Sequence, residues 1–382
     1  MTEWKEYKLG EIGTVITGKT PSARNPEDWG DEILFVTPSD YRNYGKYANN
    51  SERKLSNIGS KRLLNKMLPP KSILVTCIGS DMGKVVMSKT NCITNQQINA
   101  LIPNKQFDND FLYYSLINIY DTLRIMGGDG TAVPIVNKGD FEKIVLSLPP
   151  LDEQRRIAAI LSSLDDKIDL LHRENATLEQ MAETLFRQWF VVEAKEEWEE
   201  GKLGDEFAFT MGQSPNGDSF NEEGIGIPMY QGNADFGFRF PTRRVYTTQP
   251  TRFAEVNDTL ISVRAPVGAQ NMAIEKCCIG RGVAAFRYKN NPSYYSYTYY
   301  KLKSLLEEIK QFNDNGTVFG SISKSNFENL DIVIPDENTI VSFQQQVKPI
   351  DDKIINNNNE IQTLIQTRDG LLPRLISGEV KL

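Results

Sequence analysis

The chain has 382 residues, of which 40% are hydrophobic and 24% charged, and its formal net charge is −7 at pH 7. These values are ordinary for a globular protein, argue against a generic basic nucleic-acid binder, and predict two or three domains. No apolar run approaches the length of a membrane span and the N-terminal residues hold no signal-peptide core, so we expect a cytoplasmic protein with no membrane partner.

Basic charge is concentrated in two zones. Residues 41–80 carry eight basic side chains and one acidic one, and residues 239–289 carry nine and three. Residues 151–197 instead carry 6 basic and 11 acidic side chains. The negative total therefore hides two local cationic zones, which are suited to a polyanion.

The second half of the chain repeats the first. WKEYKLGEIGTVITGKTP from Trp4 and WEEGKLGDEFAFTMGQSP from Trp198 are identical at seven of 18 positions, at an offset of 194. DGTAVPIVNKGDFEKIVLSLPP from Asp129 matches NGTVFGSISKSNFENLDIVIPD from Asn315 at an offset of 186. The first copy therefore carries eight extra residues within its cationic zone.

Each copy has the pattern of a mixed α+β module. Short apolar stretches broken by Gly, Pro and Asn predict strands. FLYYSLINIYDTL from Phe111 and YYSYTYYKLKSLLEEI from Tyr294 predict at least one helix in each copy. We expect two similar modules of domain size.

A heptad pattern follows each module and predicts a coiled coil. Apolar residues alternate at spacings of four and three over more than four heptads, and the pattern recurs 186 residues later. Pro349 predicts a kink or a late start of the second helix. The predicted interface positions are Ile157, Leu161, Leu164, Ile168, Leu171, Asn175, Leu178, Leu185 and Trp189, then Phe343, Val347, Ile350, Ile354, Asn357, Ile361, Leu364 and Leu371.

An antiparallel pairing of the two helices gives a specific register. In one such register, the residue numbers of any two facing residues add up to 532, so that Asn175 faces Asn357 and Leu171 faces Ile361. This register is favoured because two asparagines that meet can satisfy each other, whereas one against leucine is buried unpaired. We therefore predict modules at residues 1–150 and 198–335, and long helices within 151–197 and 336–382.

Catalytic and metal-binding patterns are not recognisable in the sequence. The four cysteines contain no C-x-x-C pair, and the single histidine, His172, falls on the outer side of the predicted coiled coil. NPSY at Asn291 is a near miss for an amino-methyltransferase motif, and we interpret it as an Asn cap and a first-turn Pro. We expect no catalytic residue and no metal site.

Candidate DNA-reading residues combine planar polar side chains, arginines and glycine-rich turns, because Asn and Gln pair with adenine and Arg with guanine. Gly-Thr pairs offer a hydroxyl to phosphate. The alternative is that individual members are turn or surface residues, so the cationic zones carry the prediction as wholes. The candidates are Lys19, Thr20, Arg24, Arg42, Lys46, Asn95, Gln96, Gln97 and Thr131 in the first copy, and Gln213, Ser214, Asn216, Gln231, Asn233, Arg243, Arg244, Arg264, Arg281 and Thr317 in the second.

The order of these motifs resembles the specificity subunits of type I restriction–modification enzymes over essentially the whole chain. The resemblance is carried by KLGE and GKTP from Lys8, SILVTCIG from Ser72, TNQQINALIP from Thr94 and LPPLDEQRRIAAILSSLDDKI from Leu148. The second copy departs from it, with IGRGVAAF from Ile279 and PDENT from Pro335.

The resemblance implies a pseudo-twofold protein with two target-recognition domains, each reading half of a bipartite asymmetric site in double-stranded DNA. The helices would set the gap and dock two adenine-methyltransferase subunits, and restriction (translocase) subunits would join them. S-adenosylmethionine, ATP and Mg would then belong to those partners, with no cofactor in this chain.

Two alternatives remain open from the residues alone. One is a non-enzymatic coiled-coil scaffold that presents two similar modules to protein partners, which the acidic helices suit. The other is a nuclease or methyltransferase fused to its own reader, against which the missing motifs argue.

Overall fold

The computed structural model describes residues 4–43, 45–128, 134–264, 266–313, 320–380 and 382. The chain forms two compact units. One contains residues 1–172 and 359–382, and the other contains residues 173–358. Each unit therefore combines one repeat copy with part of both long helices, and each is described below by itself.

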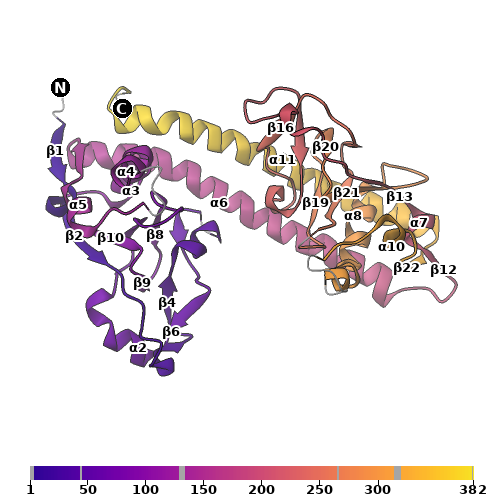
Figure 1. Cartoon of the computed structure of the whole chain (residues 1–382), viewed down its shortest axis with the longest axis horizontal. Helices are drawn as coiled ribbons and strands as arrows, with labels where there is room; N and C mark the ends of the chain where they lie inside the picture. Colours follow the sequence, from indigo (N-terminus) through magenta and orange to yellow (C-terminus); the bar gives the residue numbers. More distant parts are fainter. Residues whose placement is uncertain (1–3, 44, 129–133, 265, 314–319, 381) are drawn as a thin grey trace. The chain divides into compact units, whose positions relative to one another are not determined.

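The first unit contains two larger sheets and a two-stranded ribbon (Figure 1). The strand orders are β2-β10-β7-β8-β5, β3-β6-β4-β9 and β1-β11. The strands are β1 (Lys5–Lys8), β2 (Gly13–Thr17), β3 (Trp29–Gly30), β4 (Ile33–Val36), β5 (Tyr47–Ala48), β6 (Arg53–Leu55), β7 (Ile73–Thr76), β8 (Val85–Ser88), β9 (Cys92–Thr94), β10 (Ile98–Pro103) and β11 (Val145–Leu148). The short helices are α1 (Leu9–Ile12), α2 (Asn57–Arg62), α3 (Asn109–Asn118), α4 (Tyr120–Met126) and α5 (Lys138–Lys143).

The second unit repeats this arrangement, with sheets β13-β21-β18-β19, β14-β16-β15-β20-β17 and β12-β22. Its strands are β12 (Glu199–Lys202), β13 (Phe207–Met211), β14 (Phe220–Asn221), β15 (Ile227–Tyr230), β16 (Val245–Thr247), β17 (Phe253–Ala254), β18 (Thr259–Ser262), β19 (Gln270–Met272), β20 (Cys277–Ile279), β21 (Val283–Tyr288) and β22 (Asp331–Ile334). Its short helices are α7 (Leu203–Glu206), α8 (Tyr295–Ser304), α9 (Leu306–Lys310) and α10 (Lys324–Glu328). The predicted helix of each copy is thus two helices, which break at Ile119 and Leu305.

Six of the eight extra residues of the first copy correspond to α2, because the offset is 192 where Leu55 of β6 and Thr247 of β16 face Ile33 and Ile227. Leu68 pairs with Cys92 as Ala254 pairs with Cys277, and the offset between Leu68 and Ala254 is 186. The offset therefore changes between β6 and Leu68, where α2 lies and the second copy has no counterpart among its described residues.

The long helices are α6 (Leu151–Arg187), which ends in a π-helical turn over Gln188–Val192, and α11 (Glu337–Ile376). The predicted late start of the second helix is wrong, because α11 begins at Glu337 and continues through Pro349. Phe343 and Val347, in the second and third turns of α11, are fully buried in the second unit's core. This packing stabilises the turns that the proline weakens.

The two helices have the antiparallel register that the asparagines predict. In the second unit, Asn357 donates to Asn175 Oδ1 at 2.8 Å, and Trp189 lies edge-to-face with Phe343 at 6.1 Å between ring centroids. In the first unit, Leu171 packs with Ile361 in one apolar cluster. Each of the seventeen predicted interface positions is buried or half-buried, and His172 is exposed.

Candidate nucleic-acid interface

Loops that follow four strands meet at one end of the sheets in the first unit. Lys19 after β2 donates its backbone N–H to Thr94 O at the end of β9 (2.8 Å). Asn95 after β9 donates to Val36 O at the end of β4 (3.1 Å). Cys77 after β7 donates to Gln97 O (2.7 Å), which joins the fourth loop. Two different sheets therefore contribute to one continuous loop surface, defined here as the first interface.

The second unit builds its counterpart from the equivalent hydrogen bonds. Gln213 N donates to Ile279 O (3.0 Å), and Gly280 N donates to Tyr230 O (2.8 Å). Val263 N donates to Gly282 O (2.9 Å). We define the loops after β13, β15, β18 and β20 as the second interface.

Glycine is required where the loops cross in each copy. A Cβ on Gly18 would overlap the carbonyl oxygens of Thr94 and Asn95, and a Cβ on Gly212 would overlap the carbonyl oxygen of Gly280. The GKTP and GQSP turns are therefore repeated because the backbones approach too closely for any side chain. The residues that follow these glycines are left at the surface.

The side chains on the two surfaces differ although their backbones correspond. In the first interface, Thr20 donates to Gln96 Oε1 at 2.7 Å, and Asn95 donates to Gln97 Oε1 at 2.8 Å. In the second interface, the Ser214 hydroxyl accepts from Arg281 N at 3.3 Å. One surface therefore presents amides, and the other an arginine.

Most of the predicted reading residues are accessible, although several lie outside the crossing loops. Arg24 and Arg42 lie in turns after β2 and β4, and Asn216 forms a turn with Asp218 N. The exposed candidates are Lys19, Arg24, Arg42, Gln96, Gln213, Asn216, Gln231, Asn233, Arg243, Arg244, Arg264 and Arg281, while Thr20, Gln97 and Ser214 are half-buried. Asn95 is buried, and Thr131 and Thr317 lie outside the described residues.

Lys46 does not lie on the surface, contrary to the prediction that it reads DNA. Its side chain is buried, its ammonium group pairs with Asp110 at 2.5 Å, and it donates to Ser162 at 2.7 Å. A cation in this environment is committed to protein partners. We therefore leave Lys46 out of the interface.

Three of the second-copy arginines differ in how they are held. Arg244 forms a two-nitrogen contact with buried Asp235 at 2.8 and 3.2 Å, and Arg243 pairs with Glu275 at 2.5 Å. Among the residues that the structure describes, no carboxylate pairs with the guanidinium of Arg281. Arg281 is therefore more available to an incoming anion than Arg243 or Arg244.

Sequence reasoning missed the carboxylates that shape these loops. Asp40 accepts from Thr37 N at 2.8 Å, and Asp235 accepts from Gln231 N at 2.6 Å. Both aspartates are buried and occupy corresponding places after β4 and β15. Their recurrence in the two copies, at an offset of 195, is the signal that could have identified them.

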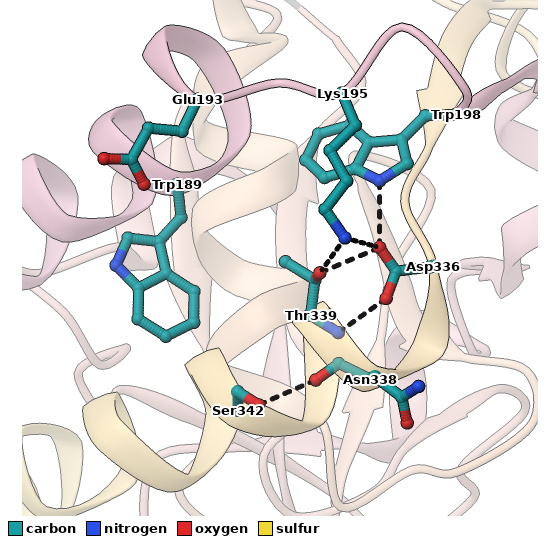
Figure 2. Close-up of a pocket in the computed structure, with 8 residues that line it drawn as sticks. All are labelled: Trp189, Glu193, Lys195, Trp198, Asp336, Asn338, Thr339 and Ser342. Carbon is teal, nitrogen blue, oxygen red and sulfur yellow. Dashed lines mark hydrogen bonds and ion pairs between the residues drawn. The ribbon is translucent and has the colours of Figure 1, made fainter.

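An open hollow of about 440 Å³ lies at the start of α11 in the second unit (Figure 2). Asp336 caps the helix by accepting from Thr339 N at 3.0 Å, and it also accepts from Lys195 Nζ at 2.8 Å and Trp198 Nε1 at 3.0 Å. The bond from Lys195 is the main reason why the pKa of Asp336 lies well below its usual range. With both of its carboxylate oxygens engaged, Asp336 fixes the start of α11 and is not available as a free acid or base.

The described residues contain no cluster of His, Cys, Asp and Glu that could hold a metal ion. Burial raises the pKa of Cys77, Cys92 and Cys277 to about 12, so these thiols are protonated at neutral pH. NPSY is a turn before α8, because Asn291 accepts from Ser293 N at 3.1 Å while Tyr294 occupies the cap position. The prediction that Asn291 caps this helix is therefore wrong. No helix among the described segments has the length and apolar character needed to span a bilayer.

Comparison with known proteins gives one consistent result. The family described as the type I restriction modification DNA specificity domain matches residues 1–180 and again residues 195–366. The putative type I restriction enzyme MjaX specificity subunit of Methanocaldococcus jannaschii is 31% identical over 100% of this chain and 94% of its own length. The HindI specificity subunit of Haemophilus influenzae is 36% identical over 38% of this chain and 32% of its own length.

The fold is also found among solved structures. The crystal structure of a type I restriction–modification S subunit from M. genitalium covers 98% of this chain and 96% of its own, with a TM-score of 0.61 and 18% identity. At that identity the likeness concerns the fold alone. The mixed sheets and two long helices are therefore features that the two chains share.

Proposed function

The chain belongs to the family of type I restriction–modification specificity subunits, which are non-catalytic and recognise DNA, and we propose that each of its two interfaces reads one half of a bipartite, asymmetric site. The proposal concerns how recognition is divided within the chain. It assigns the first half-site to the loops around Thr20 and Gln96, and the second to the loops around Ser214 and Arg281.

One observation carries this proposal: the same backbone construction occurs twice with different side chains. Gly18–Lys19 and Gly212–Gln213 cross the loops after β9 and β20 through equivalent hydrogen bonds. At the corresponding places the first interface carries Gln96 and Gln97, and the second carries Arg281. A repeated frame with different reading groups suits a site whose halves differ.

The side-chain chemistry supports a different base preference for each interface. Gln offers a donor and an acceptor that match the N7 and N6 of adenine, whereas the Arg fork matches the O6 and N7 of guanine. Lys19, Arg24 and Arg42 supply cations to the phosphate backbone around the first interface. We therefore expect the first half-site to include adenine in contact with Gln96, and the second to include guanine in contact with Arg281.

We further propose that two adenine-methyltransferase subunits and the restriction subunits assemble on the two long helices. S-adenosylmethionine, ATP and Mg would bind in those subunits. The exposed faces of α6 and α11 support this assignment, because acidic side chains such as Asp166, Asp169, Glu183 and Glu360 lie exposed on them.

The proposal that each interface reads one half-site can be tested by selecting bound duplexes from a random pool. The chain is used in complex with its methyltransferase. We expect two conserved blocks separated by a gap of fixed length. Thr20→Ala with Gln96→Ala should change one block, and Gln231→Ala with Arg281→Ala should change the other. A variant pair that alters both blocks equally, or a motif without a gap, would contradict the proposal.

A further inference from the structure

A buried cation joins the sheets of each copy to the long helices, at the same place in both copies. Met87 donates its backbone N–H to Lys46 O at 2.9 Å, and Met272 donates to Arg239 O at 2.9 Å. Lys46 is 8% exposed and Arg239 is 2% exposed. The two cations are therefore structural equivalents, although sequence alignment alone gives no clear offset for them.

In the first unit, Lys46 reaches the helices directly and through a tyrosine. Its ammonium group donates to Ser162 of α6 at 2.7 Å and lies 4.9 Å from the centre of the Tyr114 ring. The Tyr114 hydroxyl donates to Asp165 of α6 at 2.6 Å, and Arg368 of α11 donates to the same carboxylate at 2.7 Å.

In the second unit, Arg239 makes the corresponding connection to α11. Its guanidinium lies 2.8 Å from Asp351 and stacks on the Tyr299 ring at 3.3 Å. The Tyr300 hydroxyl donates to Asp351 at 3.3 Å. The Tyr299 hydroxyl donates to Glu179 of α6 at 3.5 Å, so both helices are engaged.

The tyrosines and the helix aspartate of one cluster correspond to those of the other at a single sequence offset. Tyr113 and Tyr114 lie 186 residues before Tyr299 and Tyr300, and Asp165 lies 186 residues before Asp351. Each cluster also contains two ion pairs around its tyrosines. They join Lys46 to Asp110 and Arg368 to Asp165 in the first unit, and Arg239 to Asp351 and Lys303 to Glu179 in the second.

Stability alone is a weak reason for such clusters. Replacing a buried ion pair by apolar side chains of similar volume is often neutral or stabilising. Apolar contacts, however, accept small shifts between the packed surfaces, whereas charge-assisted hydrogen bonds to planar groups fix an angle as well as a distance. The clusters are thus suited to fixing the orientation of each copy on the helices beneath it.

We propose that Lys46 and Arg239 are positioning residues, each of which holds its own copy, through the tyrosine pair and the helix aspartate, at the angle its interface needs to meet DNA. The proposal rests on the function proposed above and adds to it a determinant of specificity that does not touch DNA. It predicts that disturbing one cluster loosens recognition of one half-site only.

The test is a variant that removes the buried Arg239–Asp351 ion pair of the second cluster without leaving a buried charge unpaired. Arg239→Met, Tyr300→Phe and Asp351→Leu together achieve this, because Glu179 keeps its 2.6 Å contact with Lys303. We expect this triple variant, in complex with the methyltransferase, to keep the thermal stability of the wild type. A mismatched base pair normally weakens specific binding by roughly 5- to 150-fold, and we expect this ratio to fall about tenfold, or to no discrimination, in the second half-site alone.

The matched variant in the first unit is Lys46→Met with Tyr114→Phe, which should loosen only the other half-site. Arg239→Lys keeps the charge but loses the planar fork, and should fold with intermediate discrimination. If the triple variant does not fold, base discrimination by Arg239→Lys at the second half-site is the deciding measurement. Unchanged discrimination in a folded Arg239 variant, or equal loss at both half-sites, would overturn the proposal. A wild-type complex that selects no motif would instead overturn the proposed function.

Discussion

Arg281 and Arg244 lie on the same interface but differ in how free their charges are. Arg244 is held by a two-nitrogen contact to buried Asp235, which in turn fixes Gln231 N. Removing Arg244 therefore disturbs a loop as well as a charge. Within the described part of the chain no partner is found for the guanidinium of Arg281, and its backbone N–H donates to Ser214, so this side chain can be removed more cleanly.

We expect Arg281→Ala to weaken specific binding by about 1–3 kcal/mol and to relax the preference at one base pair. The measurement is titration of cognate and singly mismatched duplexes at fixed salt. Lys276→Ala is the matched control, because Lys276 is an exposed cation at the opposite end of β20. Equal losses in the two variants would mean that Arg281 contributes only general charge.

Glu206 gives the second unit a pH dependence. Burial raises its pKa to about 7, although the charge of Lys301 and the 2.6 Å bond from the Tyr297 hydroxyl oppose this. Since the folded state holds this proton at pH values where the unfolded state has lost it, stability falls as the pH rises from about 4.5 to about 7.

Glu206→Gln should remove this slope. Above pH 7 we expect the variant to unfold at a higher temperature than the wild type, with a free energy of unfolding larger by at most about 3 kcal/mol. Near pH 5 the two proteins should differ little in stability. Thermal melts at several pH values measure this. Glu200→Gln, at an exposed position of β12, should leave the profile unchanged, and identical slopes in wild type and Glu206→Gln would refute the assignment.

At the scale of elements, the helix pair shows which interactions the sequence reveals. The spacing of four and three residues is a local pattern, and the two asparagines leave only one register in which they meet. The clusters around Lys46 and Arg239 could not be predicted in this way. Arg239 and Asp351 are 112 residues apart, and only the folded sheets bring them together.

The asparagine pair should specify the register at a cost in stability. Asn175 and Asn357 are 3% and 1% exposed, and the Oδ1 atom of Asn357 has no hydrogen-bond partner within the described residues. We expect Asn175→Leu alone to destabilise the chain by about 1–3 kcal/mol, because the buried Asn357 amide then faces leucine and keeps only its 3.1 Å bond to Glu174. The double change to leucine should recover or exceed the wild-type stability.

Chemical denaturation of the two variants and the wild type tests this prediction. Asn356→Leu is the control, since Asn356 is an exposed neighbour on the same helix. A single variant as stable as the double variant would show that the asparagines do not depend on each other.

At the scale of the whole chain, the duplication accounts for most of what the sequence predicts. Offsets of 194 and 186 place two copies and two helices, and six of the eight extra residues of the first copy lie at α2. The interfaces were predicted less completely, because the cationic zones do not show which charges become paired. Lys46 is buried in a zone that also supplies exposed Arg42.

Salt dependence tests whether the two cationic surfaces bind DNA. Because phosphate contacts release counterions, the affinity of the complex for its site should fall steeply between about 50 and 200 mM salt, by roughly 10³- to 10⁵-fold for six to ten contacts. A nearly flat dependence would favour a scaffold that binds proteins. The Arg281→Ala variant should lower the slope by about 1 if that arginine also contacts phosphate.

The central claim is that this chain directs DNA modification to a sequence with two parts, each read by one copy. The most direct measurement is a map of methylated adenines in a methylation-free host that expresses this chain with its methyltransferase subunit. We expect one new motif with two specific blocks, a gap of constant length and one modified adenine on each strand. A stable complex of the two proteins that produces no new motif would contradict it.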